Sequence, residues 1–461
     1  MKKQHRINTE ETIAAISTPL GEGAIGIVRL SGKDAVRIAD RIFRSKKGRP
    51  ASSFRSFTSH YGHVLEKGAI VDEALLTVMR APKSYTKEEM VEISCHGGIV
   101  PLRKTLGLVL ENGARLAEPG EFTKRAFLNG RLDLTQAEAV LDIIRSKTDA
   151  SLKVALGQLD GRLSSALNRI KDVLVSVSAD IEASIDFPDE DIEIMSEAKI
   201  RQQLESARDG ISRLLETSEK GIILREGLSC VICGKPNVGK SSLLNALVEK
   251  DRAIVTHIPG TTRDAVEEFT NIAGAPFKLV DTAGVAPTED VVEREGILRS
   301  RWHIESADLI LLVLDAGSPE TGEDRVLLDD TEGRPRIIVL NKIDLPKKIS
   351  FSPSDGETVV EVSAKEGRGI EGLRKAMSEA VFGGKIQAPE GAVITNMRQR
   401  EALRSACGAL ERAIKAVADG SSPEFIAIDI RESLDSVGEV VGEVVTDDIL
   451  DRVFSQFCIG K

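Results

Sequence analysis

The sequence lacks a long hydrophobic run. No segment approaches the ~20 consecutive apolar residues that a membrane-spanning helix needs. The first residues, Met1 to Arg6, lead into Glu10 and Glu11 without an uninterrupted apolar stretch, so an export signal is not indicated either. We therefore expect no membrane span and a cytoplasmic location.

Cysteine is scarce, and its number is odd. Five cysteines without an export signal indicate free thiols in a reducing compartment. Cys230 and Cys233 have the spacing of a redox or zinc motif, but both fall in an apolar run that predicts a β-strand. Residues three apart on a strand point to opposite faces, so we expect neither a disulfide nor a shared metal at this pair.

An excess of basic residues is also absent. The formal net charge of −10 argues against a broad surface that coats nucleic acid, although a local basic patch or a partner protein would still allow RNA binding. The length of 461 residues exceeds the ~250–300 at which single hydrophobic cores stop growing. We therefore expect two or three domains.

Four short strings in the middle of the chain predict a guanine-nucleotide pocket. They are Gly234–Ser241, Asp281–Gly284, Asn341–Asp344 and Ser363–Lys365. The first has the Gly-x-x-x-x-Gly-Lys-Ser pattern, whose backbone N–H groups surround phosphate oxygens at a helix N-terminus. Its context fits, because an apolar run over 228–233 enters the loop and a segment with helical spacing over 242–248 leaves it.

Each string has a role that its chemistry suggests. Lys240 is expected to meet the β- and γ-phosphates and Ser241 the magnesium ion, whose shell Asp281 would complete. The backbone N–H of Gly284 would face the γ-phosphate. Asp344 offers a carboxylate to guanine N1–H and the 2-amino group, donors that adenine lacks at those positions. The string Ser363–Lys365 would contact the base edge opposite that carboxylate.

Apolar runs at 277–280, 309–314, 336–340 and 358–362 predict the other strands of the nucleotide domain, and helical segments flank it. Upstream, 136–220 has long helical periodicity, with Ile200, Leu204, Ile211 and Leu215 on one stripe. The acidic segment Asp186–Asp191 is most simply a solvated helix break, with a magnesium or partner role as the alternative. Downstream, 396–417 and 423–440 predict helices, and Thr446 is expected to cap a last helix through Phe457.

The first ~120 residues predict a separate α+β domain. Strands are expected at 25–30, 74–78 and 91–94, and helices at 34–43 and 102–111. The expected fold class is α/β and α+β multidomain, with a P-loop GTPase domain inserted into an all-helical domain. The GTPase sheet is expected to be mostly parallel and doubly wound. The expected boundaries are 1–122, 123–221, 222–384 for the nucleotide domain, and 385–461.

The whole chain resembles the MnmE (TrmE) family of tRNA-modification GTPases. The motifs that carry the resemblance are Thr18–Gly32, Ser84–Thr86, His96–Gly98, Gly120–Gly130, the phosphate loop with Asn237, Gly260–Asp264 and Cys458–Lys461. The resemblance implies a homodimer that works with the flavoprotein MnmG. Together they would place an aminomethyl or carboxymethylaminomethyl group on C5 of the wobble uridine of certain tRNAs.

The resemblance also implies that the N-terminal domain holds a tetrahydrofolate one-carbon derivative, in the 5-formyl or 5,10-methylene form. Its contacts transfer by motif to Arg29, Glu92, Arg131 and Lys461. A pterin presents the same adjacent N–H and amino donors as guanine, which suit the carboxylate of Glu92. Arg131 stands where some relatives have lysine, so the charge is kept and the geometry can differ.

Cys458 has two interpretations. A thiol near the end of the sequence can be mobile and reactive as its thiolate, or it can pack as a small apolar residue beside Phe454 and Phe457. With the family resemblance we favour a role in catalysis for Cys458.

For GTP hydrolysis, Val285 stands where Ras-like enzymes orient water with glutamine. Several carboxylates follow, namely Glu289, Asp290, Glu293 and Glu295, and their spacing does not choose among them. The family pattern selects Glu293.

The resemblance implies a potassium ion in place of an arginine finger, because a hard cation with several oxygen ligands can neutralise charge between the β- and γ-phosphates. Its ligands would be Asn237, Thr256, Ile258 and Thr261, while Thr262 would join the magnesium shell. Ala286 stands where some relatives carry arginine. The remaining nucleotide contacts expected by resemblance are Val238, Gly239, Ser242, His257, Pro259, Gly260, Thr282, Ala283, Lys342 and Ala364.

Two other functions stay open. One is a GTPase switch that binds ribosomal RNA during ribosome assembly without covalent chemistry; such proteins usually add a KH domain, and the segment after Lys385 predicts helices instead. The other is a nucleotide-dependent scaffold, which would need neither the folate residues nor Cys458.

Overall fold

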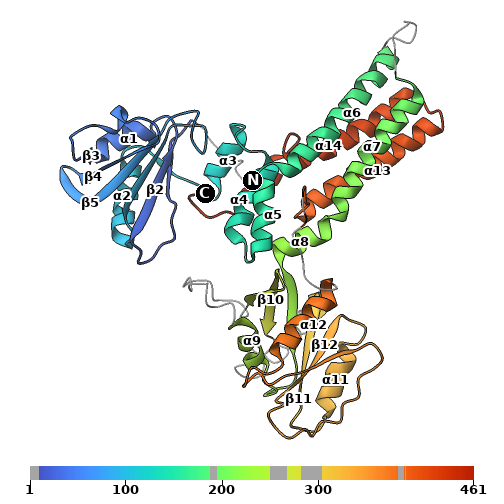
Figure 1. Cartoon of the computed structure of the whole chain (residues 1–461). Coiled ribbons are helices and arrows are strands. Elements are labelled where there is room, and N and C mark those ends of the chain that lie inside the picture. The colour runs from blue at the N-terminus through green and yellow to red at the C-terminus, as the bar shows by residue number, and fades with distance from the viewer. Residues whose placement is uncertain (1–9, 187–194, 250–266, 282–303, 383–388, 390) are drawn as a thin grey trace, which may run out of the picture. The chain divides into compact units, whose positions relative to one another are not determined.

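The computed structural model describes residues 10–186, 195–249, 267–281, 304–382, 389 and 391–461, and it divides into two units (Figure 1). The first unit comprises the described residues up to Leu141 together with Leu434–Lys461. The second comprises those of Asp142–Ser433. The last residues of the chain therefore fold with the first ones, although the whole second unit separates them in sequence.

The first unit is built on a sheet with the strand order β3-β4-β5-β6-β2-β1-β7. Its strands are β1 (Ile13–Ile16), β2 (Ile25–Ser31), β3 (Phe43–Ser45), β4 (Thr58–Glu66), β5 (Ala69–Met79), β6 (Met90–His96) and β7 (Arg115–Leu116). Helices α1 (Ala35–Ile42) and α2 (Ile99–Glu111) pack on one face, where Val28 and Leu30 join the main core. Because side chains alternate along a strand, Arg29 points to the other face.

The other face of this sheet has a smaller core that involves helix α3 (Glu121–Leu128). Phe122 of α3 joins Ile13 and Ala15 of β1 and Met90 of β6 in this core. Phe127 of α3 packs on a further cluster, formed by the first part of α4 (Leu134–Arg145) with α15 (Asp447–Phe454). Helix α3 therefore touches both the sheet and the last helix of the chain.

The nucleotide region of the second unit has a sheet with the order β13-β12-β11-β8-β10-β9. Its strands are β8 (Leu228–Cys233), β9 (Glu267–Ile272), β10 (Ala275–Asp281), β11 (Leu309–Asp315), β12 (Arg336–Asn341) and β13 (Thr358–Glu361). All pairs are parallel except β9 with β10. Helices α9 (Lys240–Val248) and α12 (Ile370–Phe382) pack on one face, and α11 (Gly322–Asp330) packs on the other. This is the expected doubly wound arrangement.

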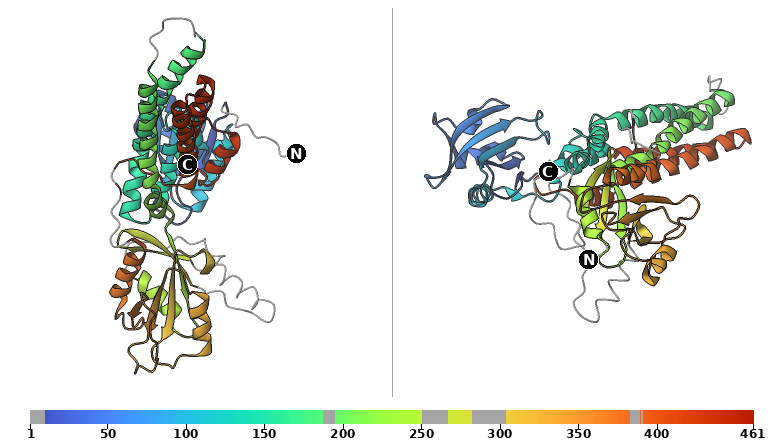
Figure 2. Two further views of the ribbon diagram at one scale, coloured as in Figure 1. Left: turned by 90° about the vertical axis from the view of Figure 1, so that its right-hand side faces the viewer. Right: turned by 60° about the horizontal axis from the view of Figure 1, so that its bottom comes forward.

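Helices flank the nucleotide region on both sides in sequence, as expected. They are α5 (Asp149–Leu159), α6 (Arg162–Asp186), α7 (Glu197–Glu216), α8 (Ser218–Glu226), α13 (Met397–Ala418) and α14 (Pro423–Val441). The long helices α6, α7 and α13 run side by side, with α7 packed against both neighbours (Figure 2). No described helix is both long and apolar enough to cross a bilayer.

Three details of the helices differ from the sequence predictions. Helix α2 begins at Ile99, three residues before the predicted start at 102. The buried stripe of α7 ends with Leu214 rather than Leu215, which is half-buried. Thr446 occupies the N-cap of α15 but its side chain makes no capping hydrogen bond, and the helix ends at Phe454, three residues before the predicted end. Phe457 still packs in the adjoining cluster. Its side chain is therefore buried although the residue lies beyond the end of the helix. Most of the acidic segment at 186–191 lies outside the described residues.

Candidate nucleotide and folate sites

The described parts of all four predicted nucleotide strings lie at one edge of the parallel sheet. The phosphate loop follows β8, Asp281 ends β10, Asn341 ends β12 and Ser363 follows β13. Parallel strands bring their carboxyl ends to the same edge, where open α/β sheets bind ligands. Along this edge, the strings after β8 and β10 lie on one side of β11, and those after β12 and β13 lie on its other side.

The phosphate loop has the backbone conformation that its glycines allow. Gly234 has a φ of 153°, and a Cβ there would lie 2.4 Å from the carbonyl oxygen of Val313. Gly239 has a φ of 98° at the N-cap of α9. The buried Lys240 donates from Nζ to the carbonyl oxygens of Gly234 and Lys235, at 2.9 and 3.0 Å. Burial lowers the pKa of Lys240, and the charge of Asp281 opposes that shift.

Ser241 and Asp281 form a pair whose oxygens suit a magnesium ion. The hydroxyl of Ser241 donates to Oδ2 of Asp281 at 2.8 Å. Asp281 is buried at the end of β10, and Ser241 lies in the first turn of α9. A hydroxyl and a carboxylate beside a phosphate loop are hard oxygen donors, which Mg²⁺ prefers. The residues present therefore fit the metal that the sequence predicted.

Asn341 and Lys342 clamp the loops to one another. Asn341 donates from Nδ2 to the carbonyl oxygen of Val238 at 2.8 Å and accepts from the N–H of Ala364 at 3.0 Å. Lys342 donates from Nζ to the carbonyl oxygen of Asn237 at 2.7 Å and pairs with Asp315 at 2.7 Å. These contacts connect the phosphate loop with both base-side loops.

Asp344 lies at the surface of the base side of this sheet edge. The hydroxyl of Ser363 donates to its Oδ1 at 2.7 Å. That hydrogen bond is the main reason why the pKa of Asp344 lies below its usual value. The carboxylate is therefore ionised at neutral pH and held by Ser363, as an acceptor for two ring donors must be. Lys365 follows in the same loop.

The other predicted residues of the nucleotide site lie outside the described residues. These are Thr256, His257, Ile258, Pro259, Gly260, Thr261, Thr262, Thr282, Ala283, Gly284 and Glu293. Val285 and Ala286 lie outside them as well. Of the expected potassium ligands, only Asn237 is described. It is exposed and has a φ of 64°, a left-handed conformation that asparagine tolerates.

Sequence reasoning missed one support of the phosphate loop. Lys235 pairs with Asp324 at 2.7 Å, and Asp324 also accepts from the hydroxyl and the N–H of Thr321 at the start of α11. Burial of Asp324 would raise its pKa, but these contacts, led by Lys235, bring it below the usual value. Asp324 lies 89 positions beyond Lys235, so no local pattern indicated the pair.

Cys230 and Cys233 point to opposite faces of the sheet, as predicted. Cys230 packs in the core beneath α9 and α12, and Cys233 packs in the core on the α11 side. Both are buried free thiols, and burial raises the pKa of Cys233 to about 12. Among the described residues, no group of three or more His, Cys, Asp and Glu side chains is arranged to hold a metal ion.

The four candidate folate residues lie in the first unit. Arg29 of β2 and Glu92 of β6 are directly paired across the sheet. Arg29 donates from Nε and Nη2 to Oε1 of Glu92, both at 2.8 Å, and both side chains are partly exposed. Oε2 of Glu92 has no hydrogen-bond partner among the described residues, so one carboxylate oxygen is available to a ligand.

The segment Cys458–Lys461, which we call the tail, reaches the same place. Nη1 of Arg29 donates to the carbonyl oxygen of Gly460 at 3.3 Å, across 431 positions of sequence. Gly460 has a φ of 99°, and a Cβ there would lie 2.5 Å from the carbonyl oxygen of Ile16. The half-buried Lys461 has a pKa lowered by burial and by the charge of Arg29, while Cys458 and Glu92 oppose the shift.

Cys458 is exposed, which contradicts the alternative that it packs beside Phe454 and Phe457. Both phenylalanines are buried without it. The helix ends before Cys458, so the thiol stands on the tail rather than on the packed face of the last turn.

Two aromatic rings support the arginines, and sequence reasoning gave them no role. The ring of Tyr85 lies 5.9 Å from the guanidinium of Arg29 and 4.7 Å from that of Arg131. Arg131 also donates to the carbonyl oxygen of Tyr85 at 3.2 Å. The ring of Phe122 lies 5.8 Å from the guanidinium of Arg29. The signal was present, because Tyr85 is one of only two tyrosines and lies in a family motif.

These residues fit a reduced folate. The pterin ring requires an acceptor for adjacent N–H and amino donors, which Glu92 provides with its available oxygen. The carboxylates of a folate require positive charge, which Arg29, Arg131 and Lys461 provide around them. Tyr85 and Phe122 give the guanidinium groups aromatic support.

Comparison with known proteins decides the family. A profile described as the MnmE helical domain matches residues 134–458, and one described as the GTP-binding protein TrmE N-terminus matches residues 12–131. The tRNA modification GTPase MnmE of Geobacillus thermodenitrificans is 50% identical over 458 residues, which is 98% of this chain and 99% of that protein. The chain belongs to the MnmE (TrmE) family.

Other members of this family are similar over the same length. The tRNA modification GTPase MnmE of Geobacillus kaustophilus is 49% identical over 98% of this chain and 99% of its own. That of Bacillus subtilis is 46% identical over 98% of this chain and 100% of its own. Family membership and the two sheets confirm the predicted fold class and the prediction of a GTPase.

Proposed function

We propose that this chain hydrolyses GTP and, with the flavoprotein MnmG, adds an aminomethyl or carboxymethylaminomethyl group to C5 of the wobble uridine of certain tRNAs. The carbon would come from a tetrahydrofolate derivative in the 5-formyl or 5,10-methylene form. One observation carries the proposal: Arg29 and Glu92 of the sheet meet Gly460 and Lys461 of the tail in one place. A nucleotide switch alone has no need of that arrangement.

In the nucleotide site, each described residue has a proposed part. Lys240 leaves its two carbonyl partners for the β- and γ-phosphates, and Ser241 and Asp281 hold the magnesium ion. Asp344 binds guanine N1–H and the 2-amino group. A magnesium ion held by Ser241 and Asp281 would supply positive charge against the phosphates. Asn341 and Lys342 keep the loops together while this occurs.

For hydrolysis, we propose that Glu293 orients the attacking water. A potassium ion would be bound by Asn237, Thr256, Ile258 and Thr261, and Thr262 would be a ligand of the magnesium ion. The exposed side chain of Asn237 is compatible with this part. Equal GTPase rates in potassium and in sodium salts would contradict the potassium site.

In the folate site, Glu92 would accept from the pterin, and Arg29, Arg131 and Lys461 would bind the remaining acceptors and carboxylates of the folate. The folate supplies a carbon at the oxidation level of formaldehyde or formate. Cys458 stands on the same tail as Lys461 and is exposed, so we assign it a catalytic role in the transfer.

We also propose that the chain has four segments with separate roles, forms a homodimer and works in the cytoplasm. The N-terminal segment 1–122 would bind folate, 123–221 and 385–461 would form the helical domain, and 222–384 would bind GTP.

The deciding experiment is mass spectrometry of wobble nucleosides in tRNA from cells that lack the gene. We expect the C5-modified uridines to disappear and to return when the gene is restored. Normal nucleosides combined with accumulated immature ribosomal subunits would favour the alternative, a ribosome-assembly GTPase.

A further inference from the structure

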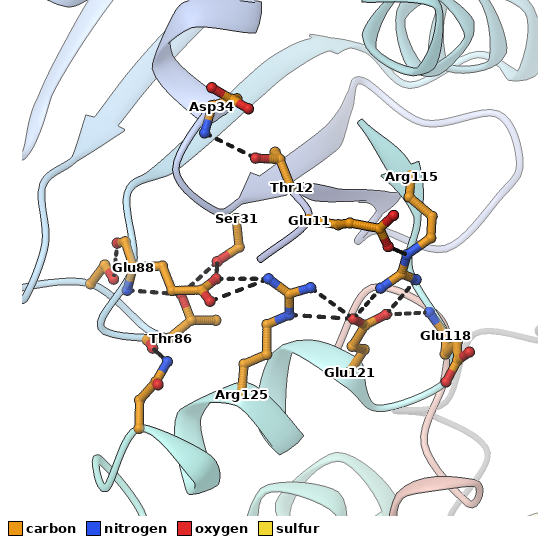
Figure 3. Close-up of polar contacts among 12 residues, drawn as sticks. Glu11, Thr12, Ser31, Asp34, Thr86, Glu88, Arg115, Glu118, Glu121 and Arg125 are labelled. Atoms are coloured by element: carbon orange, nitrogen blue, oxygen red, sulfur yellow. Dashed lines mark hydrogen bonds and ion pairs between the residues drawn. The ribbon is translucent and has the colours of Figure 1, made fainter. Parts of the chain in front are cut away.

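A chain of ion pairs links helix α3 to neighbouring segments of the first unit (Figure 3). Arg125 donates to Oε1 of Glu121 from Nε and Nη2, at 3.3 and 2.9 Å, and from Nη1 to both oxygens of Glu88 at 3.2 Å. Arg115 donates to both oxygens of Glu121, at 3.0 and 2.7 Å. The side chains of Glu121 and Arg125 are both 0% exposed.

The chain of contacts continues to the sheet on one side and to the start of α3 on the other. Glu88 accepts from the hydroxyl of Ser31 at 2.6 Å, so Arg125 is connected to the end of β2. Oε2 of Glu121 accepts from the N–H of Glu118 at 2.9 Å, which fixes the turn before α3. Figure 3 shows Glu121 and Arg125 pointing toward each other between these partners.

Helix α3 contacts several members of the candidate folate site. The N–H of Phe122 donates to the main-chain oxygen of Lys461 at 3.2 Å, and the N–H of Gly120 donates to the carbonyl oxygen of Cys458 at 3.4 Å. Pro119 forms an isolated β-bridge with Ile459. The tail is therefore attached to the first turn of α3 by its backbone.

The same helix holds the aromatic support of the arginines. The hydroxyl of Thr123 is 2.9 Å from that of Tyr85, whose ring faces Arg29 and Arg131. The second ring, that of Phe122, belongs to α3 itself and lies against the guanidinium of Arg29. The position of α3 on the sheet thus sets both the tail and the rings.

The buried charges make that position sensitive to a single change. Burial would raise the pKa of Glu121, but Arg115, the N–H of Glu118 and Arg125 outweigh it, and the pKa lies below the usual value. Glu121 is therefore ionised at neutral pH. A buried charge that loses one partner stays uncompensated, so the chain of contacts is disturbed as a whole.

We propose that Glu121 and Arg125 are positioning residues for the folate site: they fix α3, and α3 places the tail with Cys458 and Lys461 beside Arg29. This inference rests on the proposed folate function, although both side chains are fully buried. Glu121 and Arg125 would thus hold the tail in place, whereas other residues of the site bind the folate.

The test is hydrogen exchange of the full chain, with Glu121→Gln as the variant. Glutamine keeps the shape but brings an amide against two guanidinium groups. We expect the amides of Gly120 and Phe122 to exchange about tenfold faster, because their hydrogen bonds to the tail open more often. Titration with a reduced folate should show an affinity about tenfold weaker. The amides of β4 should exchange as in the wild-type chain.

The matched control is Glu89→Gln in the same unit. Glu89 pairs with Arg80 at 2.9 Å, and this pair does not contact α3. If Glu121→Gln does not fold, Arg125→Lys replaces it, because it keeps the charge and loses the two-sided guanidinium contacts. For that variant we also expect faster exchange at Gly120 and Phe122 and weaker folate binding, but both changes should be smaller.

Unchanged exchange at Gly120 and Phe122 would overturn the inference, and so would an equal increase throughout β4 and β5, which indicates plain loss of stability. Failure of the wild-type chain to bind any reduced folate would overturn the proposed function instead. In that case, hydrogen exchange at Gly120 and Phe122 still shows whether Glu121 and Arg125 hold the tail in place.

Discussion

The nucleotide site and the candidate folate site are built in different ways. In the nucleotide site, the described groups stand at the carboxyl ends of parallel strands, on the loops that follow them or in the first turn of α9, between Gly234 and Lys365. In the folate site, Arg29 and Glu92 pair across antiparallel strands, and the tail joins them from 431 positions away. One site lies along one edge of a sheet, and the other is assembled from distant segments.

The supports differ as well. The side chains of Asn341 and Lys342 hold the loops of the nucleotide site by donating to backbone carbonyl oxygens. The folate site depends on α3, which a fully buried ion pair fixes. Local changes should therefore weaken the nucleotide site group by group, whereas the folate site should respond to changes in residues that touch no ligand.

The sharpest separation of the two sites is expected from Cys458→Ser. The thiol is exposed on the tail and belongs to no nucleotide loop. We expect tRNA modification to be abolished while GTP hydrolysis continues, since a serine hydroxyl is a far weaker nucleophile than a thiolate. Nucleoside mass spectrometry and phosphate release measure the two activities. Cys407→Ser is the control, and normal modification by Cys458→Ser would exclude the catalytic role.

The next largest effect is expected from Asp344→Asn. We assign this carboxylate to two guanine donors; an amide would leave one of them facing another donor, so GTP affinity should fall about a hundredfold. Xanthosine triphosphate, with a carbonyl at that position, should bind the variant better than GTP. Fluorescence titration measures both affinities. Glu361→Gln, which changes an exposed carboxylate paired with Lys347, is the control. If Asp344→Asn binds GTP as tightly as the wild-type chain, Asp344 does not bind the guanine base.

In the other site, Glu92→Gln should weaken binding of a reduced folate about tenfold, because a neutral amide is a poorer partner for the pterin donors and for Arg29. GTP affinity should stay the same, since the variant lies in the first unit. Calorimetric titration with each ligand separates the two, and Glu89→Gln serves as the control. An equal loss for both ligands would mean that the sites are not independent in the way described.

The smallest effect is expected from Asp324→Asn. The variant loses the charge that holds Lys235 against α11, but the ammonium group stays partly exposed to water. GTP affinity should fall only about threefold, because an amide oxygen there can still accept from Thr321 and only the support by Lys235 is lost. Asp329→Asn on the exposed side of the same helix is the control. A loss as large as that of Asp344→Asn would show that the pair has a larger role than loop support.

The sequence alone predicted much of the nucleotide domain. The bounds of β8 matched the apolar run 228–233, because a buried strand in a parallel sheet is apolar at nearly every position. The helical stripe of α7 was predicted less well. Leu214 and Leu215 are both apolar neighbours, so only packing decides which of them is buried.

The candidate folate site was accessible only through the family resemblance. Arg29 and Glu92 alone look like an ordinary surface ion pair, and the tail carries no signal of where it packs. Tyr85, Glu121 and Arg125 lay in recognised motifs, but their contacts depend on how α3 lies on the sheet. Asp324 and Lys235 show the same limit in the nucleotide domain, since their pairing is set by the position of α11 rather than by spacing.

The most direct test of the account is titration of one preparation of the purified chain with GTP, ATP and a reduced folate. The account predicts that GTP binds in the presence of magnesium, that ATP does not compete with it, and that the folate binds at a separate site without displacing GTP. Comparable affinity for ATP, or no binding of the folate, would contradict it.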